Sequence, residues 1–139
     1  MRTLILAVTT LAIAVPASAQ PLDPATRRIA QAWQRGDVNS IGSFAARSGL
    51  SLDVGGQKIG PLHARQAAMA LKRVFERVET VSASIGQAHE VEGDPRRAFV
   101  EITWVTKAPG TSIPESSQVF FGLVLDGDTW RITEIRLIQ

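Results

Sequence analysis

The stretch SQVFFGLVLDGDTWRITEIRLI, residues 117–138, contains two runs in which every second residue is apolar, on either side of a short turn. Such alternation is typical of β-strands with one buried face, and Asp126-Gly127-Asp128 favours a tight hairpin turn between the runs. The apolar parity slips between Ile132 and Ile135, which predicts a β-bulge in the second strand. The stretch therefore predicts a hairpin of two long strands that present one apolar face.

Two further strands are predicted before this hairpin. Residues 98–107 alternate, so that Trp104 and the apolar residues at every second position before it face one way while Glu101 faces the other. Residues 81–91 also alternate, except at Gly86, where a glycine within a strand indicates a bulge or a sharp bend. Consecutive strands joined by short turns form an antiparallel meander, and its apolar face needs a cover.

Residues before the meander have the periodicity of helices. Asp23-Pro24 favours a helix start, and Asp37 can cap a second, short helix. The longest helix is predicted over residues 63–78, and we expect its apolar stripe to cover the sheet. That stripe consists of Leu71, Val74, Phe75 and Val78. Residues 50–54 predict one short strand before this helix, and Gly60-Pro61 is expected to break the chain.

Residues 1–19 have the pattern of a cleavable export signal. A positive start precedes an apolar run over residues 4–15, and Ala17-Ser18-Ala19 supplies the small residues that a signal peptidase recognises. The run has about a dozen residues, whereas a membrane-spanning helix needs about twenty. We therefore expect cleavage after Ala19, with residues 20–139 forming a periplasmic or secreted domain without a stable membrane anchor.

The composition narrows the classes of function. The 139 residues suit one domain, and they include no cysteine, which excludes a disulfide framework, a thiol nucleophile and a thiolate metal site. The net charge of +2 is too small to predict nucleic-acid binding by bulk charge.

The charges are unevenly distributed along the chain. Residues 20–77 carry nine Lys or Arg and four Asp or Glu, whereas residues 78–139 carry five and nine. One interpretation is that the two halves face and attract each other. The other is a basic helical surface that binds an anionic partner.

The order of the predicted elements resembles that of the NTF2-like, or cystatin-like, cone. The resemblance is carried by the helix over residues 29–36 with Asp37 after it, by the helix over residues 67–75 that runs into strands, and by the closing turn followed by Trp-Arg-Ile, residues 126–132. It implies an α+β fold over residues 20–139, with N-terminal helices packed in the concavity of a curved antiparallel sheet. This superfamily includes isomerases, dehydratases, transport factors and secretion components, so the fold does not select a function.

Three side chains are candidate proton carriers. Glu101 would be a buried base if the Phe99 face of its strand were concave, and it would be solvated if the Trp104 face were concave. His63 lies at a helix start, where it could cap the helix or bind an anion, and His89 lies on a strand. No HxH or HExxH spacing joins the two histidines, so no metal site is predicted.

The aromatic residues also bear on chemistry. No tyrosine is present, whereas steroid-isomerase-like members of the superfamily use a tyrosine hydroxyl beside an acid to hold an oxyanion, so that mechanism is not expected. Trp33, Trp104 and Trp130 lie in apolar patterns, which favours core packing over ligand stacking.

The expected function is a non-catalytic small-ligand-binding or protein-interaction module of the cell envelope, without a cofactor. The alternative is a small-molecule isomerase, dehydratase or hydrolase that uses Glu101, His63 or His89 in the cone pocket. Expected partners are an apolar small molecule, an envelope protein, or a second copy of the chain paired through the sheet. Nucleic acid is not an expected partner.

Overall fold

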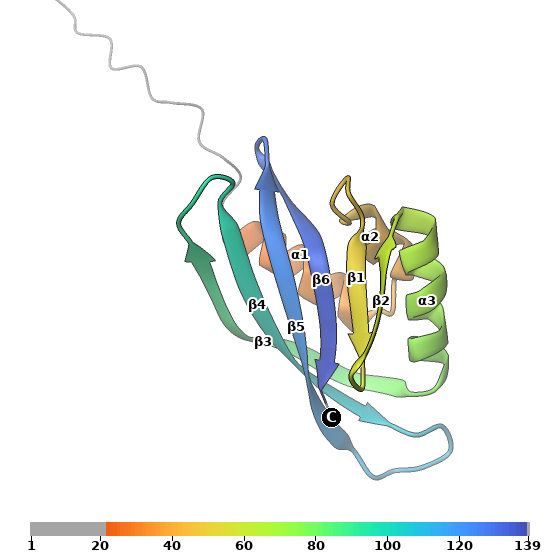
Figure 1. The fold of residues 1–139 in the computed structure, drawn as a ribbon. Coiled ribbons are helices and arrows are strands. Elements are labelled where there is room, and N and C mark those ends of the chain that lie inside the picture. The colour runs from red at the N-terminus through yellow and green to blue at the C-terminus, as the bar shows by residue number, and fades with distance from the viewer. Residues whose placement is uncertain (1–21, 139) are drawn as a thin grey trace, which may run out of the picture.

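The computed structural model describes residues 22–138, in which three helices accompany one six-stranded sheet (Figure 1). The elements are α1 (Leu22–Gln34), α2 (Val38–Ser43), β1 (Leu50–Val54), β2 (Gln57–Leu62), α3 (Ala64–Glu76), β3 (Glu79–Val91), β4 (Arg97–Lys107), β5 (Glu115–Asp126) and β6 (Thr129–Ile138). The predicted signal peptide, residues 1–19, lies outside the described residues. Within them, no helix is both long and apolar enough to cross a membrane.

The sheet has the strand order β2-β1-β6-β5-β4-β3. Strands β3 to β6 form the predicted antiparallel meander, but β1 pairs in parallel with β6, so the sheet is mixed. Both predicted bulges are confirmed. The register shifts between Ile85 and Gln87 in β3, and Gly122 and Leu123 of β5 face Glu134 and Ile132 of β6, which leaves one extra residue on β6.

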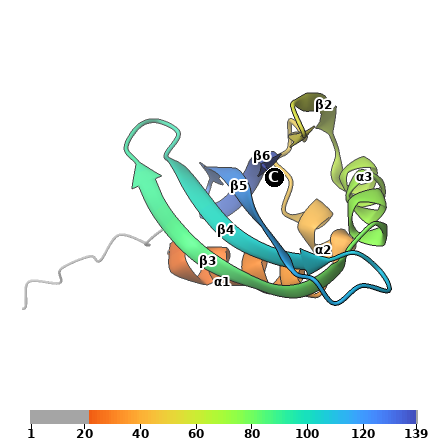
Figure 2. The same ribbon diagram turned by 90° about the horizontal axis from the view of Figure 1, so that it is seen from below.

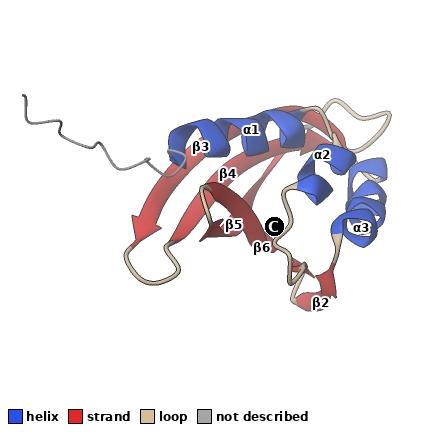
Figure 3. Cartoon of the chain, turned by 90° about the horizontal axis from the view of Figure 1, so that it is seen from above, coloured by secondary structure: helices blue, strands red, loops and turns tan. Residues whose placement is uncertain are grey.

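One face of the meander is buried and the other is partly solvated. On β4 the residues of the Trp104 face are buried, from Ala98 to Thr106, whereas Phe99 on the opposite face is exposed. Helix α1 lies across β3 and β4 on the buried side (Figure 3). Its stripe includes small residues, which let the helix approach the sheet, and ends in the fully buried Trp33.

The expectation that the longest helix covers the sheet is wrong in its main part. Helix α3 packs chiefly on α2 and stands beside the β1–β2 end of the sheet (Figure 2), while α1 is the cover. Only Leu71 of the α3 stripe is fully buried; Val74, Phe75 and Val78 are partly buried at the edge of the core. The reason is the connection: β2 is an edge strand and α3 follows it directly.

Strand β2 is absent from the sequence prediction. Its residues are exposed except for Leu62, so no apolar alternation marks it, and Gly60-Pro61 indicated a break. Proline is tolerated on an edge strand, where its missing N–H leaves no gap in the sheet. Gly55 and Gly56 form the turn that joins β1 to β2, and both have the positive φ that this turn requires.

The short helix α2 is held at its N-terminus by a side-chain cap and at Gly42 by packing against α3. Asp37 caps it, accepting hydrogen bonds from Ser40 N at 3.2 Å and from Ser40 Oγ at 2.6 Å. These hydrogen bonds, together with the nearby Arg35 guanidinium, hold the pKa of the Asp37 carboxyl below its usual value. Gly42 lies directly against α3, where a Cβ would overlap the carbonyl oxygen of Ala64.

Candidate functional site

The interior of the cone is filled by aromatic side chains. The Trp33 ring centroid lies 4.9 Å from that of Phe75, 5.3 Å from that of Trp104 and 5.4 Å from that of Phe121. Trp104 and Trp130 are also buried, so the prediction of core packing for the tryptophans is confirmed. Among residues 22–138, Thr26 and Thr106 are the buried polar side chains, and neither can carry a proton near neutral pH.

Trp33 has one unusual feature at the centre of this cluster. Its Nε1 is buried and has no hydrogen-bond partner within the described part of the chain. The rings of Trp104 and Phe121 are nearly perpendicular to it, at 80° and 86°. The indole N–H therefore lies among aromatic rings, where a π face is only a weak acceptor.

The three candidate proton carriers do not meet in the cone. Glu101 is half-buried on the outer face of β4, because the Trp104 face is the concave one; the condition for a buried base is therefore not met. His63 precedes α3 beside one edge strand of the sheet, and His89 lies on the other edge strand. Both histidines are exposed, and the backbone N of His63 donates to Gln66 Oε1 at 3.1 Å.

His89 and Glu101 share a shallow depression on the outer face. His89 is paired with Phe99 across β3 and β4, with ring centroids 5.6 Å apart, and Glu101 is paired with Gln87. The depression has a volume of about 70 Å³ and Phe120 borders it. Within residues 22–138 the two candidate side chains make no hydrogen bond or ion pair with each other. This volume is well below the several hundred Å³ usual for a ligand pocket.

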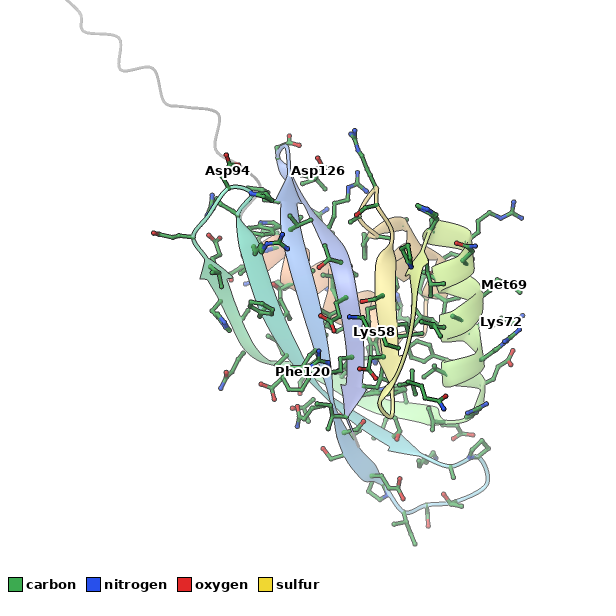
Figure 4. The ribbon with its side chains drawn as sticks, in the orientation of Figure 1. Lys58, Met69, Lys72, Asp94, Phe120 and Asp126 are labelled. Carbon is green, nitrogen blue, oxygen red and sulfur yellow. The ribbon has the colours of Figure 1, made fainter. Side chains whose placement is uncertain are left out.

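Larger hollows lie on the two sides of α3. The groove between α3 and the α1–α2 turn, which we call the helix groove, has a volume of about 640 Å³. It is lined by Gly36, Val38, Asn39, Met69, Lys72 and Phe75 among others. Met69 and Lys72 project from the outward side of α3 (Figure 4). Lys72 Nζ lies 3.9 Å from Glu76 Oε1, so the charges of this groove are mixed.

The second hollow, which we call the hairpin groove, lies between α3 and the β1–β2 hairpin and has a volume of about 330 Å³. Its apolar side chains are Leu52, Val54, Ile59, Ala70 and Val74. Ile59 is 50% exposed and Val54 is 36% exposed, so apolar surface faces solvent here. Arg73 and Arg77, one helical turn apart, border the same groove.

The ion pairs decide between the two interpretations of the uneven charge only in part. Arg47 Nε of the basic half lies 3.2 Å from Asp126 Oδ2 of the acidic half, so the two halves attract each other at this place. Arg136 Nε lies 3.9 Å from Asp53 Oδ2, which joins a cation of the acidic half to an anion of the basic half. The guanidinium groups of α3 take no part. Arg65, Arg73 and Arg77 make no ion pair with any residue in 22–138.

The groove residues were not identified from the sequence. Arg73 falls outside the apolar stripe predicted within residues 63–78, and Ile59 directly precedes the break expected at Gly60-Pro61. The Gly-Gly dipeptide between Val54 and Gln57 is a hairpin signal that would have indicated β2. An isolated apolar Ile59 on such a strand would then have marked an exposed apolar position.

Comparison with known proteins bears on the fold alone. No protein-family model matches the chain, and no curated protein matches its sequence. A DUF4783 family protein from Bacteroides ovatus has a similar structure, with a TM-score of 0.64 and 17% identity over 79% of this chain and 90% of that one.

Two other solved structures are similar to the same extent. A hypothetical protein with a ketosteroid isomerase-like fold from Catenulispora acidiphila gives a TM-score of 0.62 at 20% identity, over 81% of this chain and 82% of that one. A domain of unknown function with a cystatin-like fold from Nostoc punctiforme gives 0.63 at 12%, over 84% and 74%. The chain therefore has the NTF2-like cone fold that its element order predicted.

Proposed function

We propose that this protein is an exported, non-catalytic module of the cell envelope that binds a small ligand beside helix α3. The observation that carries the proposal is the placement of hollow and filled space. The interior of the cone is occupied by the cluster around Trp33, whereas the open hollows flank α3 and expose apolar side chains. Exposed apolar surface next to polar groups is typical of a binding site.

The placement of charge supports binding rather than acid–base catalysis. General acid–base chemistry needs a positioned proton carrier close to the reacting atoms. Neither groove contains His63, His89 or Glu101 among its lining residues. The Catenulispora protein was solved in complex with trimethylamine, so a protein of this fold does hold a small molecule.

Native mass spectrometry of the protein purified from its host tests this function. We expect a species heavier than the mature chain by the mass of a small ligand. Ile59→Arg should reduce that species, because it places a long charged side chain across the hairpin groove. Ile113→Arg is the matched control, since Ile113 is 74% exposed in the β4–β5 loop and lines neither groove. A wild-type protein that never carries a ligand would contradict the proposal.

A second candidate function, protein interaction, is favoured by the outer face of the sheet. Phe99 is 48% exposed and Phe120 is 36% exposed there, on adjacent strands (Figure 4 labels Phe120). A second copy of the chain would cover both rings. Sedimentation analysis should then show a dimer that Phe120→Glu dissociates; a wild-type protein that stays monomeric at high concentration rules this candidate out.

A further inference from the structure

The hairpin groove has a charge pattern that indicates a class of ligand. The inference drawn from it rests on the proposed function. We propose that this groove binds an amphiphilic anion, a molecule with a short apolar chain and a carboxylate head. The chain would lie on Val54, Ile59 and Val74, and the head would lie between the guanidinium groups of Arg73 and Arg77.

The apolar part of the argument is exposure. Ile59 and Val54 come from a hairpin that also contributes the fully buried Leu52 to the groove, so apolar surface continues from the core out to solvent; Gln57 is the polar residue of the hairpin that lines it. Covering such surface with an alkyl chain is favourable in proportion to the area removed from water. The volume of about 330 Å³ lies at the lower end of the range for ligand pockets, which favours a short chain.

The charged part of the argument is the two arginines. Residues at positions i and i+4 of a helix are neighbours, and two like charges there repel each other. Arg73 and Arg77 have this spacing, border the groove and make no ion pair with residues 22–138. An anion between them replaces the repulsion by two charge-assisted hydrogen bonds, and guanidinium groups match the geometry of a carboxylate.

The end of the helix accounts for part of this charge. Cations near a helix C-terminus are favourable because the carbonyl groups there carry partial negative charge, and Arg77 is the C-cap residue of α3. One cation, Arg77, is enough to offset this partial negative charge. The same carbonyl groups would repel a ligand anion, and the second guanidinium group, that of Arg73, offsets this repulsion.

The helix groove is a poorer site for this ligand although it is larger. Glu76 borders it, and its carboxylate already lies near Lys72, so the groove carries both signs of charge. The hairpin groove has no acidic residue among those that line it. This difference favours the hairpin groove over the helix groove as the site of an anion.

The test uses three ligands of equal chain length in isothermal titration calorimetry: decanoate, decanol and decyltrimethylammonium. We expect decanoate to bind more tightly than decanol by tenfold or more, and the cation not to bind. Arg73→Gln and Arg77→Gln should each weaken decanoate about tenfold, the value of one charge-assisted hydrogen bond, and leave decanol unchanged. Added salt should weaken decanoate alone.

Arg27→Gln is the matched control, because Arg27 is exposed on α1 without an ion pair to residues 22–138 and lines none of the hollows beside α3. Ile59→Ala should weaken decanoate and decanol equally. Circular dichroism shows whether each variant is folded. Equal affinity for all three ligands, or an Arg27→Gln effect as large as that of Arg73→Gln, overturns the anion assignment.

The outcomes also separate this inference from the proposed function. If decanol binds as tightly as decanoate and Ile59→Ala weakens both, the groove is a ligand site and only the anion assignment fails. If none of the three ligands binds and native mass spectrometry finds no retained molecule, both fail. If none binds but a retained molecule of other chemistry is found, the inference alone is overturned.

Discussion

At the scale of single residues, Asp37 is the side chain whose ionisation is tied to a structural role. Its carboxylate accepts from the backbone and the hydroxyl of Ser40, and these contacts favour the charged form. A group whose pKa is lower in the folded state stabilises the protein above its unfolded pKa of about 3.8, and this contribution is lost as the pH falls through the folded pKa.

The first prediction follows from this linkage. Asp37→Asn keeps an acceptor but removes the charge, so it should destabilise the protein at about pH 6 and have a smaller effect at about pH 2.5, where less of the wild-type carboxyl is ionised. Urea unfolding at both pH values measures the difference. Asp94→Asn, at a carboxylate without a hydrogen bond or ion pair in the described chain, is the control. An equal effect of Asp37→Asn at both pH values would contradict the linkage.

Phe75 gives the second prediction. Its ring contacts Trp33 and Trp104, with centroids 4.9 and 5.4 Å away, but the side chain is only partly buried. Phe75→Ala should therefore cost about 2–3 kcal/mol in the free energy of unfolding, below the roughly 3–5 kcal/mol of a fully buried phenylalanine. Met69→Ala, at a residue on the same helix that is 61% exposed, should change it by less than about 0.5 kcal/mol. Equal losses of unfolding free energy in the two variants would show that Phe75 is no better packed than Met69 and would contradict this position of α3.

At the scale of the elements, α2 is a short helix held by contact rather than by length. A helix of so few residues is not stable alone, so its packing on α3 at Gly42 supplies its stability. The wall formed by α2 and α3 in turn positions both grooves.

The third prediction tests that contact. Gly42→Ala should destabilise the protein by about 1–3 kcal/mol, because a methyl group forces α2 away from Ala64, although alanine is normally the better helix former. Asn39→Ala, at an exposed position of the same helix, makes the matched control and should be neutral or stabilising. Thermal unfolding of the two variants measures both effects. A Gly42→Ala protein as stable as wild type would show that α2 can move away from α3 without loss of stability.

Sequence reasoning succeeded where periodicity is strong and failed where a strand carries little apolar signal. The meander and its two bulges followed from alternation along 81–91, 98–107 and 117–138, and the burial of the tryptophans followed from the apolar patterns around them. Strand β2 did not, because its exposed residues have no apolar face, and the position of α3 depends on β2. The hairpin groove combines residues of β1, β2 and α3, so its existence could not be predicted without that strand.

At the scale of the whole molecule, the candidate proton carriers are dispersed. His63 and His89 flank opposite edge strands, and Glu101 lies on the outer face of the sheet. No described groove beside α3 includes them. A function that depends on ligand binding at α3 should therefore be independent of all three side chains.

The fourth prediction states this as an experiment. A variant with His63, His89 and Glu101 all changed to Gln should fold and should retain the same ligand in native mass spectrometry as the wild type. The fraction of the triple variant that carries the ligand should match the fraction in the Ile113→Arg protein rather than that in the Ile59→Arg protein. Loss of the ligand, or of a cellular phenotype, in a folded and exported triple variant would favour an enzyme instead.

The fifth prediction concerns the segment that precedes the described residues. The apolar run over residues 4–15 and the Ala-Ser-Ala sequence predict removal of residues 1–19 during export. N-terminal sequencing of protein from the native host should therefore begin at Gln20. A product that still contains residues 4–15 would show that the segment is not a cleaved signal.

The parallel pairing of β1 with β6 sets an order of events for the growing chain. Ser51 pairs with Glu134, and β6 lies between β1 and β5, so the sheet stays in two pieces until β6 has been synthesised. Contacts between residues so far apart in the sequence cost loop-closure entropy and form slowly. In the nascent chain the β1–β2 hairpin consequently keeps one edge unpaired until β6 has been made, and a holding chaperone has that interval in which to bind it.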